Sequence, residues 1–461
     1  MTPLPVPADA EIASRVWATP LADTHEHLVE EEARTAFQGP GLVPCDDWAT
    51  LFSHYLDADL RVAGMPAEDH RALFSPSDDP ESKWRYLEPW WPRVKNTGYG
   101  RAVRIAVERL YGIGDVCAQT IGRLQAAYAS RVRPGFYREV LCEAASIEYC
   151  QVNSLQAPFC RTRQPLLLMQ DLSILGMHMD PASRALAEPA SIQVRDLADW
   201  HAVIRWWFDA FAPYAVAVKS QAAYGRKLDY AEMPAEAAAP IFRKIVEGEP
   251  VPGPERKKVE DHLFWFCVRL ATERQLPVKL HTGYHAGHGS MNLDWVQQNA
   301  RHACDLLRRA PDTKFVFMHI GYPYQSSFAA LAKHYSNAYL DFCWAWIIDP
   351  VSSRRFLEQL IVTVPANKIL VFGGDFIPVE PVVGHAEMAR QGVAAALSNL
   401  VGQGYLDRRD ALDLVDPLMR GNAAEVFQVD AKRKALAGAP WLDQASNPAD
   451  ANSRASGSAP S

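Results

Sequence analysis

In the N-terminal part of the sequence, the residues best suited to chemistry are two histidines separated by one residue. They are His25 and His27, in the segment LADTHEHL. The apolar pair Leu21-Ala22 before them predicts a strand, in which alternate side chains point to the same face. Two imidazoles side by side can hold a metal ion. The same spacing also arises by chance, so the rest of the sequence has to decide between a metal site and a structural pair.

Polar residues that suit a metal site also follow later apolar runs. Lys219 ends VAVK, His281 ends VKLH, His319 ends FVFMH and Asp375 ends VFGGD. If these runs are strands of one barrel, their C-terminal ends meet at one rim. Each residue also has an ordinary interpretation, such as a buried structural histidine, a lysine that reaches solvent or a capping aspartate. One shared site explains the set more simply, and its composition suits a borderline divalent ion such as zinc.

The elements that must position these residues are short apolar segments, which we interpret as strands. They are the segment around His25 and the runs 145–149, 165–170, 215–219, 277–282, 314–319, 337–342 and 369–374. They are apolar on both faces, as parallel strands covered by helices should be. Amphipathic segments lie between them, at 255–275, 292–309 and 384–403. Eight such units predict an α/β fold, a (β/α)₈ TIM barrel.

The chain divides by composition into a barrel and additions to it. Residues 1–29 hold the first strand, 30–135 a large helical insertion after it, 136–430 the rest of the barrel with a second insertion near 224–258, and 431–461 a C-terminal extension. We expect the first insertion to lie over the barrel mouth as a lid. The Ala/Ser/Pro-rich end predicts disorder from about residue 444.

The insertion is rich in aromatic and basic residues, which have two interpretations. They either line a substrate pocket or form the core of the insertion itself. The residues concerned are Trp84, Trp90, Trp91, Arg93, Tyr99 and Arg101. For most of the tryptophans we favour a core of the insertion.

Composition narrows the possible partners and location. The 461 residues are 48% hydrophobic and 22% charged, as in soluble globular proteins, and the net charge is −7. This charge argues against nucleic-acid or anionic-membrane partners. No apolar run approaches the ~20 residues of a spanning helix, no signal peptide is recognisable, and the eight cysteines form no C-x-x-C pair. We therefore expect a cytoplasmic protein that acts on a small molecule and forms a homo-oligomer.

The order of these motifs resembles the amidohydrolase superfamily, which has D-x-H-x-H on strand 1, histidines on strands 5 and 6 and aspartate on strand 8. More narrowly, HTGY, MHIGYPY, VFGGDF and GNAAEVF resemble the amidohydrolase-2, or amidohydrolase-related, branch. The resemblance spans roughly residues 18–428. That branch contains metal-dependent TIM-barrel hydrolases and decarboxylases, and the uronate isomerases are more distant relatives.

The resemblance implies roles for the residues at the strand ends. His25, His27 and Asp375 would bind the first metal, and His281 joins them in many relatives. His319 would either orient water and substrate or bind a second metal.

The resemblance allows either one or two metal ions, and a lysine on the fourth strand decides between them. In relatives with two metals this lysine is carboxylated and bridges them, whereas relatives with one metal often lack it. Lys219 stands near this place. We expect one tightly held ion, zinc or alternatively manganese, with a second ion as the other possibility.

Such a site predicts hydrolysis of a C–N bond of the amide type. A divalent metal with an open position lowers the pKa of a bound water to about 7. Asp375 would act as the base and His319 would polarise a carbonyl. Arg226 could grip a substrate carboxylate, and His285 and His288 could also contact substrate. Their ordinary interpretations are a solvated arginine and a flexible loop.

Three alternatives remain open at this stage. They are a metal-dependent non-oxidative decarboxylase, a uronate-isomerase-like enzyme and a scaffold without catalysis. An amine, carbon dioxide or an isomerised sugar acid would separate the enzymes by product, and the scaffold would bind no metal.

Overall fold

The computed structural model describes residues 8–174 and 183–443. Its eight strands are β1 (Leu21–Glu26), β2 (Ile147–Val152), β3 (Leu168–Gln170), β4 (Val218–Ser220), β5 (Val278–Leu280), β6 (Phe315–Phe317), β7 (Ala338–Asp341) and β8 (Ile369–Leu370). Each strand falls within or overlaps one of the apolar segments of the sequence. All adjacent pairs are parallel, in a three-stranded sheet β1-β2-β3 and a five-stranded sheet β4 to β8.

Backbone hydrogen bonds join the two sheets into a closed barrel. Between β3 and β4, Leu172 donates to the carbonyl of Ala217 at 2.8 Å. Between β8 and β1, Thr24 donates to the carbonyl of Phe372 at 3.1 Å, and Asp375 donates to that of His25 at 2.8 Å. The predicted (β/α)₈ barrel is therefore confirmed.

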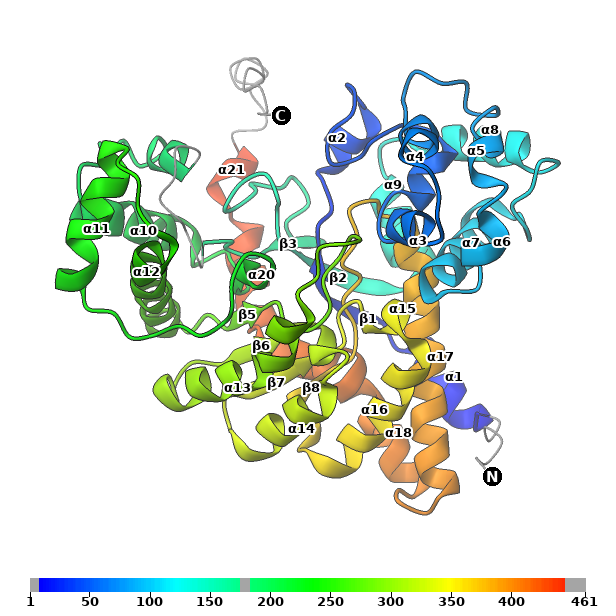
Figure 1. The fold of residues 1–461 in the computed structure, drawn as a ribbon. Coiled ribbons are helices and arrows are strands. Elements are labelled where there is room, and N and C mark those ends of the chain that lie inside the picture. Colours follow the sequence, from blue (N-terminus) through cyan, green and yellow to red (C-terminus); the bar gives the residue numbers. More distant parts are fainter. Residues whose placement is uncertain (1–7, 175–182, 444–461) are drawn as a thin grey trace.

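Helices cover the outside of the barrel and fill the connections between strands (Figure 1). Those of the barrel are α1 (Ala10–Ala18), α10 (Leu197–Phe211), α11 (Ala235–Glu247), α12 (Gly253–Glu273), α13 (Leu293–Arg309), α14 (Gln325–His334), α15 (Ala345–Ile348), α16 (Pro350–Thr363), α17 (Pro381–Gly402) and α18 (Arg408–Asp416). The chain continues through α19 (Asn422–Val426), α20 (Val429–Ala437) and α21 (Pro440–Asp443). The predicted disorder from residue 444 lies outside the described residues.

The segment between β1 and β2 is helical. It contains α2 (Glu31–Thr35), α3 (Leu56–Val62), α4 (Ala67–Leu73), α5 (Trp84–Leu87), α6 (Trp91–Val94), α7 (Gly98–Tyr111), α8 (Ile121–Arg131) and α9 (Phe136–Arg138). These helices gather into one group, coloured blue to cyan, and α7 runs against α17 (Figure 1). Trp48, Trp84 and Trp91 are buried in a separate apolar cluster of this segment, which is the core role that we favoured for most of the tryptophans.

Within the barrel, side chains form layers along the strand direction. Residues near the strand beginnings, such as Tyr149 and Val316, pack with Phe427 in one apolar cluster. Further along, the Lys279 ammonium lies 4.9 Å from the Phe427 ring and 2.9 Å from both carboxylate oxygens of Asp171. The strand ends follow, so an apolar layer and a charged layer support the residues at the rim. None of the described helices is long and apolar enough to cross a bilayer.

A buried arginine on α17 holds the chain segments that flank β1 and β2 in place. Arg390 donates to the carbonyls of Val16, Thr19 and Ser146 at 2.7, 2.6 and 3.0 Å. Burial lowers its pKa to about 10. Because a guanidinium carries several donors in a fixed geometry, one side chain binds the segments before β1 and before β2 at once.

We predict that Arg390→Leu lowers the free energy of unfolding by about 3 kcal/mol, because buried carbonyls lose their donor. Chemical denaturation measures this change. Arg355→Leu, at an exposed position of α16, is the control and should change the stability by no more than about 0.5 kcal/mol. A loss below about 1 kcal/mol for Arg390→Leu would show that water replaces the guanidinium.

Candidate metal centre

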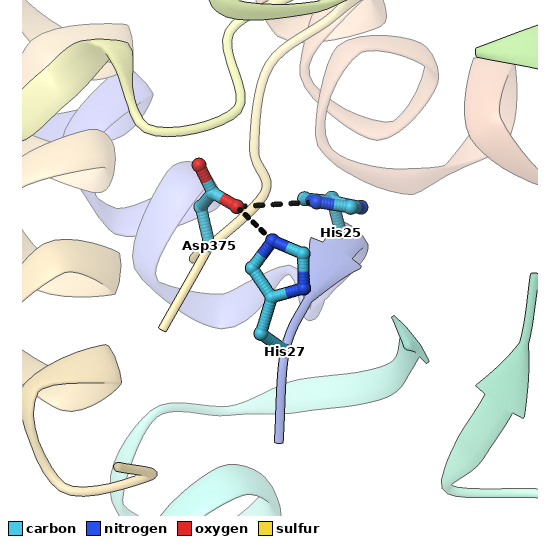
Figure 2. Close-up of side chains that lie close together, drawn as sticks. All are labelled: His25, His27 and Asp375. Atoms are coloured by element: carbon cyan, nitrogen blue, oxygen red, sulfur yellow. Dashed lines mark ion pairs between the residues drawn. The ribbon is translucent and has the colours of Figure 1, made fainter. Parts of the chain in front are cut away.

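His25, His27 and Asp375 meet at the C-terminal ends of β1 and β8 (Figure 2). Nε2 of His25 lies 3.1 Å and Nε2 of His27 lies 3.3 Å from the same carboxylate oxygen, Oδ1 of Asp375. One ligand atom from each residue lies within 4.8 Å of the others. Three buried donors of types that zinc prefers therefore surround one point.

Two glycines allow the β8 segment to approach β1 closely enough for this contact. A Cβ on Gly374 would lie 1.8 Å from Oε1 of Glu26, and one on Gly373 would lie 2.8 Å from Oγ1 of Thr24. The motif VFGGD therefore has glycine where any side chain would collide with β1. Asp375 follows with a left-handed backbone, φ 64°, which turns its carboxylate toward the histidines.

A hydrogen bond from Nδ1 fixes the ring orientation and the tautomer of His27. Nδ1 of His27 lies 2.8 Å from the carbonyl of Asn153 and donates to it, so Nε2 carries the lone pair. The side-chain amide of Gln221 lies 3.1 Å from this Nε2 and donates to it. His27 therefore has the tautomer that a metal ligand needs.

His25 is the strongest evidence that the site fits a metal. Both of its ring nitrogens are buried and have no hydrogen-bond partner among the described residues, apart from ion-pair contacts with Asp375 and, at 3.8 Å, Asp171. Buried polar atoms are rarely left in this state, since each costs about 1–3 kcal/mol. A metal at Nε2 would satisfy His25, while Asp171, itself held by Lys279, lies on the Nδ1 side.

The charges of the site favour metal binding at neutral pH. Burial, with the nearby Lys219 ammonium, lowers the pKa of His25 to about 4. Burial would raise the pKa of Asp375, but the adjacent histidines, His25 first, hold it well below its usual value. The imidazole of His25 is thus neutral and the carboxylate of Asp375 is ionised, which are the forms that bind metal.

His281 and His319 lie in a chain of contacts beside this group. Nδ1 of His319 lies 3.0 Å from the carbonyl of Cys343, its Nε2 lies 2.9 Å from Nδ1 of His281, and Nε2 of His281 lies 2.9 Å from the carbonyl of Tyr284. Three contacts need three protons, whereas two neutral imidazoles carry only two. Burial lowers the pKa of both rings, that of His319 to about 3, so one contact lacks its proton. Turning one ring toward a metal would relieve this deficit.

His319 reaches the first group only loosely, since its Nδ1 lies 3.9 Å from Oδ2 of Asp375. With Cys343 and Asp375 it forms a second group of candidate ligand atoms. Cys343 is a donor that the sequence analysis did not single out. Whether one or two ions bind stays a prediction.

Lys219 lies in β4 and is 1% exposed. Its Nζ has no hydrogen-bond partner among the described residues, and burial lowers its pKa to about 8. An amine with a lowered pKa is the form that reacts with carbon dioxide, because only the neutral amine is a nucleophile. Carboxylation of Lys219 stays a prediction.

The predicted substrate residues have different surroundings. The guanidinium of Arg226 donates to Glu260 at 2.8 Å and to Asp261 at 2.5 Å, so it is neither free for a substrate carboxylate nor solvated. We correct that expectation: Arg226 links the β4 connection to α12. His285 is buried, with its ring centre 5.7 Å from that of His281, whereas His288 is exposed.

The insertion adds two residues to the site: Tyr55, which the sequence analysis missed, and Tyr99, which it named as a possible pocket residue. The phenol of Tyr55 donates to the backbone carbonyl of Asp375 at 2.6 Å. Its ring stacks on Trp344 with centres 4.5 Å apart and on Tyr99 at 5.4 Å. The structure thus places part of the insertion over the metal ligands. No periodicity or motif marks Tyr55, although Asp171 could have been found because it directly follows an apolar run.

Comparisons with known proteins find one family model and one relative that match part of the chain. Residues 245–429 match the family model described as Amidohydrolase. Protein fluG of Emericella nidulans is 27% identical over 183 residues, which are 37% of this chain and 21% of that protein, so the match spans about a fifth of this relative.

Solved structures share the fold over nearly the whole chain. A protein from Lactobacillus casei named as a metal-dependent hydrolase has a TM-score of 0.62 at 16% identity and covers 92% of this chain and 99% of its own. Uronate isomerase from Thermotoga maritima has a TM-score of 0.73 at 14% identity and covers 90% of this chain and 96% of its own. Glucuronate isomerase from Caulobacter crescentus has a TM-score of 0.72 at 17% identity and covers 91% of this chain and 93% of its own.

The chain is therefore a TIM-barrel protein with the fold of metal-dependent hydrolases. The part of the chain that matches the Amidohydrolase family model contains strands β5 to β8.

We predict that protein purified without chelator carries about one equivalent of zinc or manganese, lost in His25→Ala and Asp375→Asn. Plasma mass spectrometry measures the metal content. His288→Ala removes an exposed imidazole and should keep the metal. Two equivalents would support a carboxylated Lys219 between two ions, and a wild type that binds no added metal would contradict the site.

A further histidine supports the Asp375 segment from behind. Nδ1 of His385, on α17, lies 3.2 Å from the carbonyl of Gly374 and donates to it, and burial lowers the pKa of this ring to about 3. Below about pH 6.5 the ring of His385 is therefore protonated in the unfolded chain, whereas it stays neutral in the folded protein. His385 must destabilise the fold as the pH falls through this range.

We predict that His385→Asn, which keeps a donor but does not titrate, removes this pH dependence. Between pH 6 and 4.5 the wild type should lose about 1.4 kcal/mol of unfolding free energy per pH unit relative to the variant. Denaturation of chelator-treated protein at several pH values measures this difference. A constant difference across the range would mean that His385 titrates normally in the folded state.

Proposed function

We propose that this protein is a metal-dependent hydrolase that cleaves a C–N bond of the amide type in a small, carboxylate-bearing substrate. The convergence of the buried rings of His25 and His27 on the ionised carboxylate of Asp375 carries this proposal. Zinc is the ion that this donor set suits best, with manganese as the alternative. It would supply a water of pKa about 7 as the nucleophile.

The roles of the chain's own residues follow from their states. Asp375 is ionised and can take the proton of the attacking water and pass it to the leaving nitrogen. His319 is neutral, and with its proton on Nε2 rather than on Nδ1, which faces the Cys343 carbonyl, it can donate to the carbonyl oxygen of the substrate. Because Arg226 is engaged elsewhere, Lys219 in its uncarboxylated, protonated form is a cation that could hold the carboxylate of the substrate. Tyr55 and Trp344 would keep bulk water out.

A uronate-isomerase-like activity is the second candidate. The fold likeness to two isomerases of sugar acids extends over 90–91% of this chain, including the region of the insertion. The same carboxylate could move a proton between neighbouring carbons of a bound sugar acid. We propose a homo-oligomeric assembly with a small-molecule substrate for either activity.

We predict that purified protein releases amine or ammonia from members of a panel of N-acyl amino acids and related amides. Asp375→Asn should reduce kcat by about 10³-fold or more, and His288→Ala should leave it unchanged. Assays of amine, carbon dioxide and isomerised sugar acid run in parallel on amides, aromatic acids and uronates. Turnover of uronates or release of carbon dioxide, without amine, would reject the hydrolase in favour of the isomerase or the decarboxylase.

A further inference from the structure

A hollow of about 440 Å³ lies on the seam between the insertion and the barrel, outside the metal centre. Its volume is that of a site for a small molecule. Charged and amide side chains line much of it: Lys95, Arg101, Arg104 and Glu108 from the insertion, and Glu387 and Gln391 from α17. Arg101, Arg104 and Glu108 are spaced by three and four residues, so they lie on one face of α7.

Part of this charge is already paired across the seam. Arg101 donates to Gln391 at 2.9 Å, and Arg109, at the edge, donates to Glu387 at 2.8 Å. Gln391 also donates to Glu387 at 3.2 Å. The carboxylate of Glu387 is therefore satisfied and adds little free negative charge to the hollow.

Two cations in the hollow have no anionic partner. Lys95 and Arg104 are half-buried, and neither side chain forms an ion pair or hydrogen bond in the part of the chain that the structure describes. Nε of Arg104 is shielded from solvent without an acceptor. With Arg101 these cations outnumber the one unpaired carboxylate, that of the exposed Glu108. Cations gathered at reduced solvent exposure repel one another unless an anion lies between them.

We propose that this hollow binds a small polyanion that carries phosphate or carboxylate groups. Guanidinium groups bind such oxyanions with two parallel hydrogen bonds, and Lys95 would add a third donor group. The ligand would bridge the insertion and the barrel, because the lining comes from α7 and α17 together.

Binding there would also stabilise the arrangement at the metal centre. Tyr99, at the start of α7, stacks on Tyr55 over the metal ligands. On the other side, a Cβ on Gly384 of α17 would lie 1.9 Å from the carbonyl of Ala102, so the two helices touch through their backbones. A polyanion across this seam therefore holds the insertion against the barrel segment that follows Asp375.

Calorimetric titration of the full chain with pyrophosphate and with citrate, at constant ionic strength, tests the proposal. We expect saturable binding and a raised Tm. The double variant Lys95→Gln with Arg104→Gln should weaken binding at least about tenfold, because two charge-assisted contacts are lost. Tighter binding of pyrophosphate would identify a phosphate ligand, and tighter binding of citrate a polycarboxylate.

Three further variants locate the bound anion in this hollow. Arg123→Gln, an exposed position of α8, loses the same type of charge and should bind as the wild type does. Glu108→Gln should tighten binding by about threefold, because it removes a repelling carboxylate. His25→Ala should bind pyrophosphate unchanged, which excludes a metal-bound anion and makes the test independent of the proposed hydrolase. Absence of saturable binding in the wild type, or equal affinity in the double variant, would overturn the proposal.

Discussion

The contact between β1 and the segment after β8 is the interaction on which the structure depends. It closes the barrel through the hydrogen bond from Asp375 to the carbonyl of His25, and the same contact brings the carboxylate to both histidines. Gly373 and Gly374 make the approach possible because a Cβ would collide with β1. The contact that closes the barrel therefore also brings the candidate metal ligands together.

The surrounding structure holds this site in a state that an isolated chain would avoid. Four non-glycine residues there have left-handed backbones: Tyr55 (φ 69°), His319 (61°), Trp344 (64°) and Asp375 (64°). Each such residue costs about 1–3 kcal/mol and persists only where packing fixes it. The cluster is also held together by charge. Asp171 lies between Lys279 and His25 and so contacts the site from within the barrel. On the insertion side, the buried Arg34 pairs with Glu380, which follows the Asp375 segment.

The candidate metal ligands are buried beside the insertion, so the packing of the insertion affects access to them. They are nearly inaccessible, and Tyr55 lies beside them with its phenol bound to the backbone carbonyl of Asp375. If the proposed substrate enters by a movement of the insertion, the seam between α7 and α17 would resist that movement. The unpaired cations of Lys95 and Arg104 lie on that seam.

The sequence by itself determined the barrel and the residues that the strand ends bring together as candidate metal ligands. Apolar runs that end in His25, His281, His319 or Asp375 record local patterning, and parallel strands bring such ends together whatever the connections are. Only the tertiary structure decided the partners of these residues. Arg226 formed ion pairs with Glu260 and Asp261 instead of facing the site, and Tyr55 entered the site from a segment without periodic pattern. Contacts between distant segments depend on how the insertion packs on the barrel, and residue spacing along the chain holds no record of that packing.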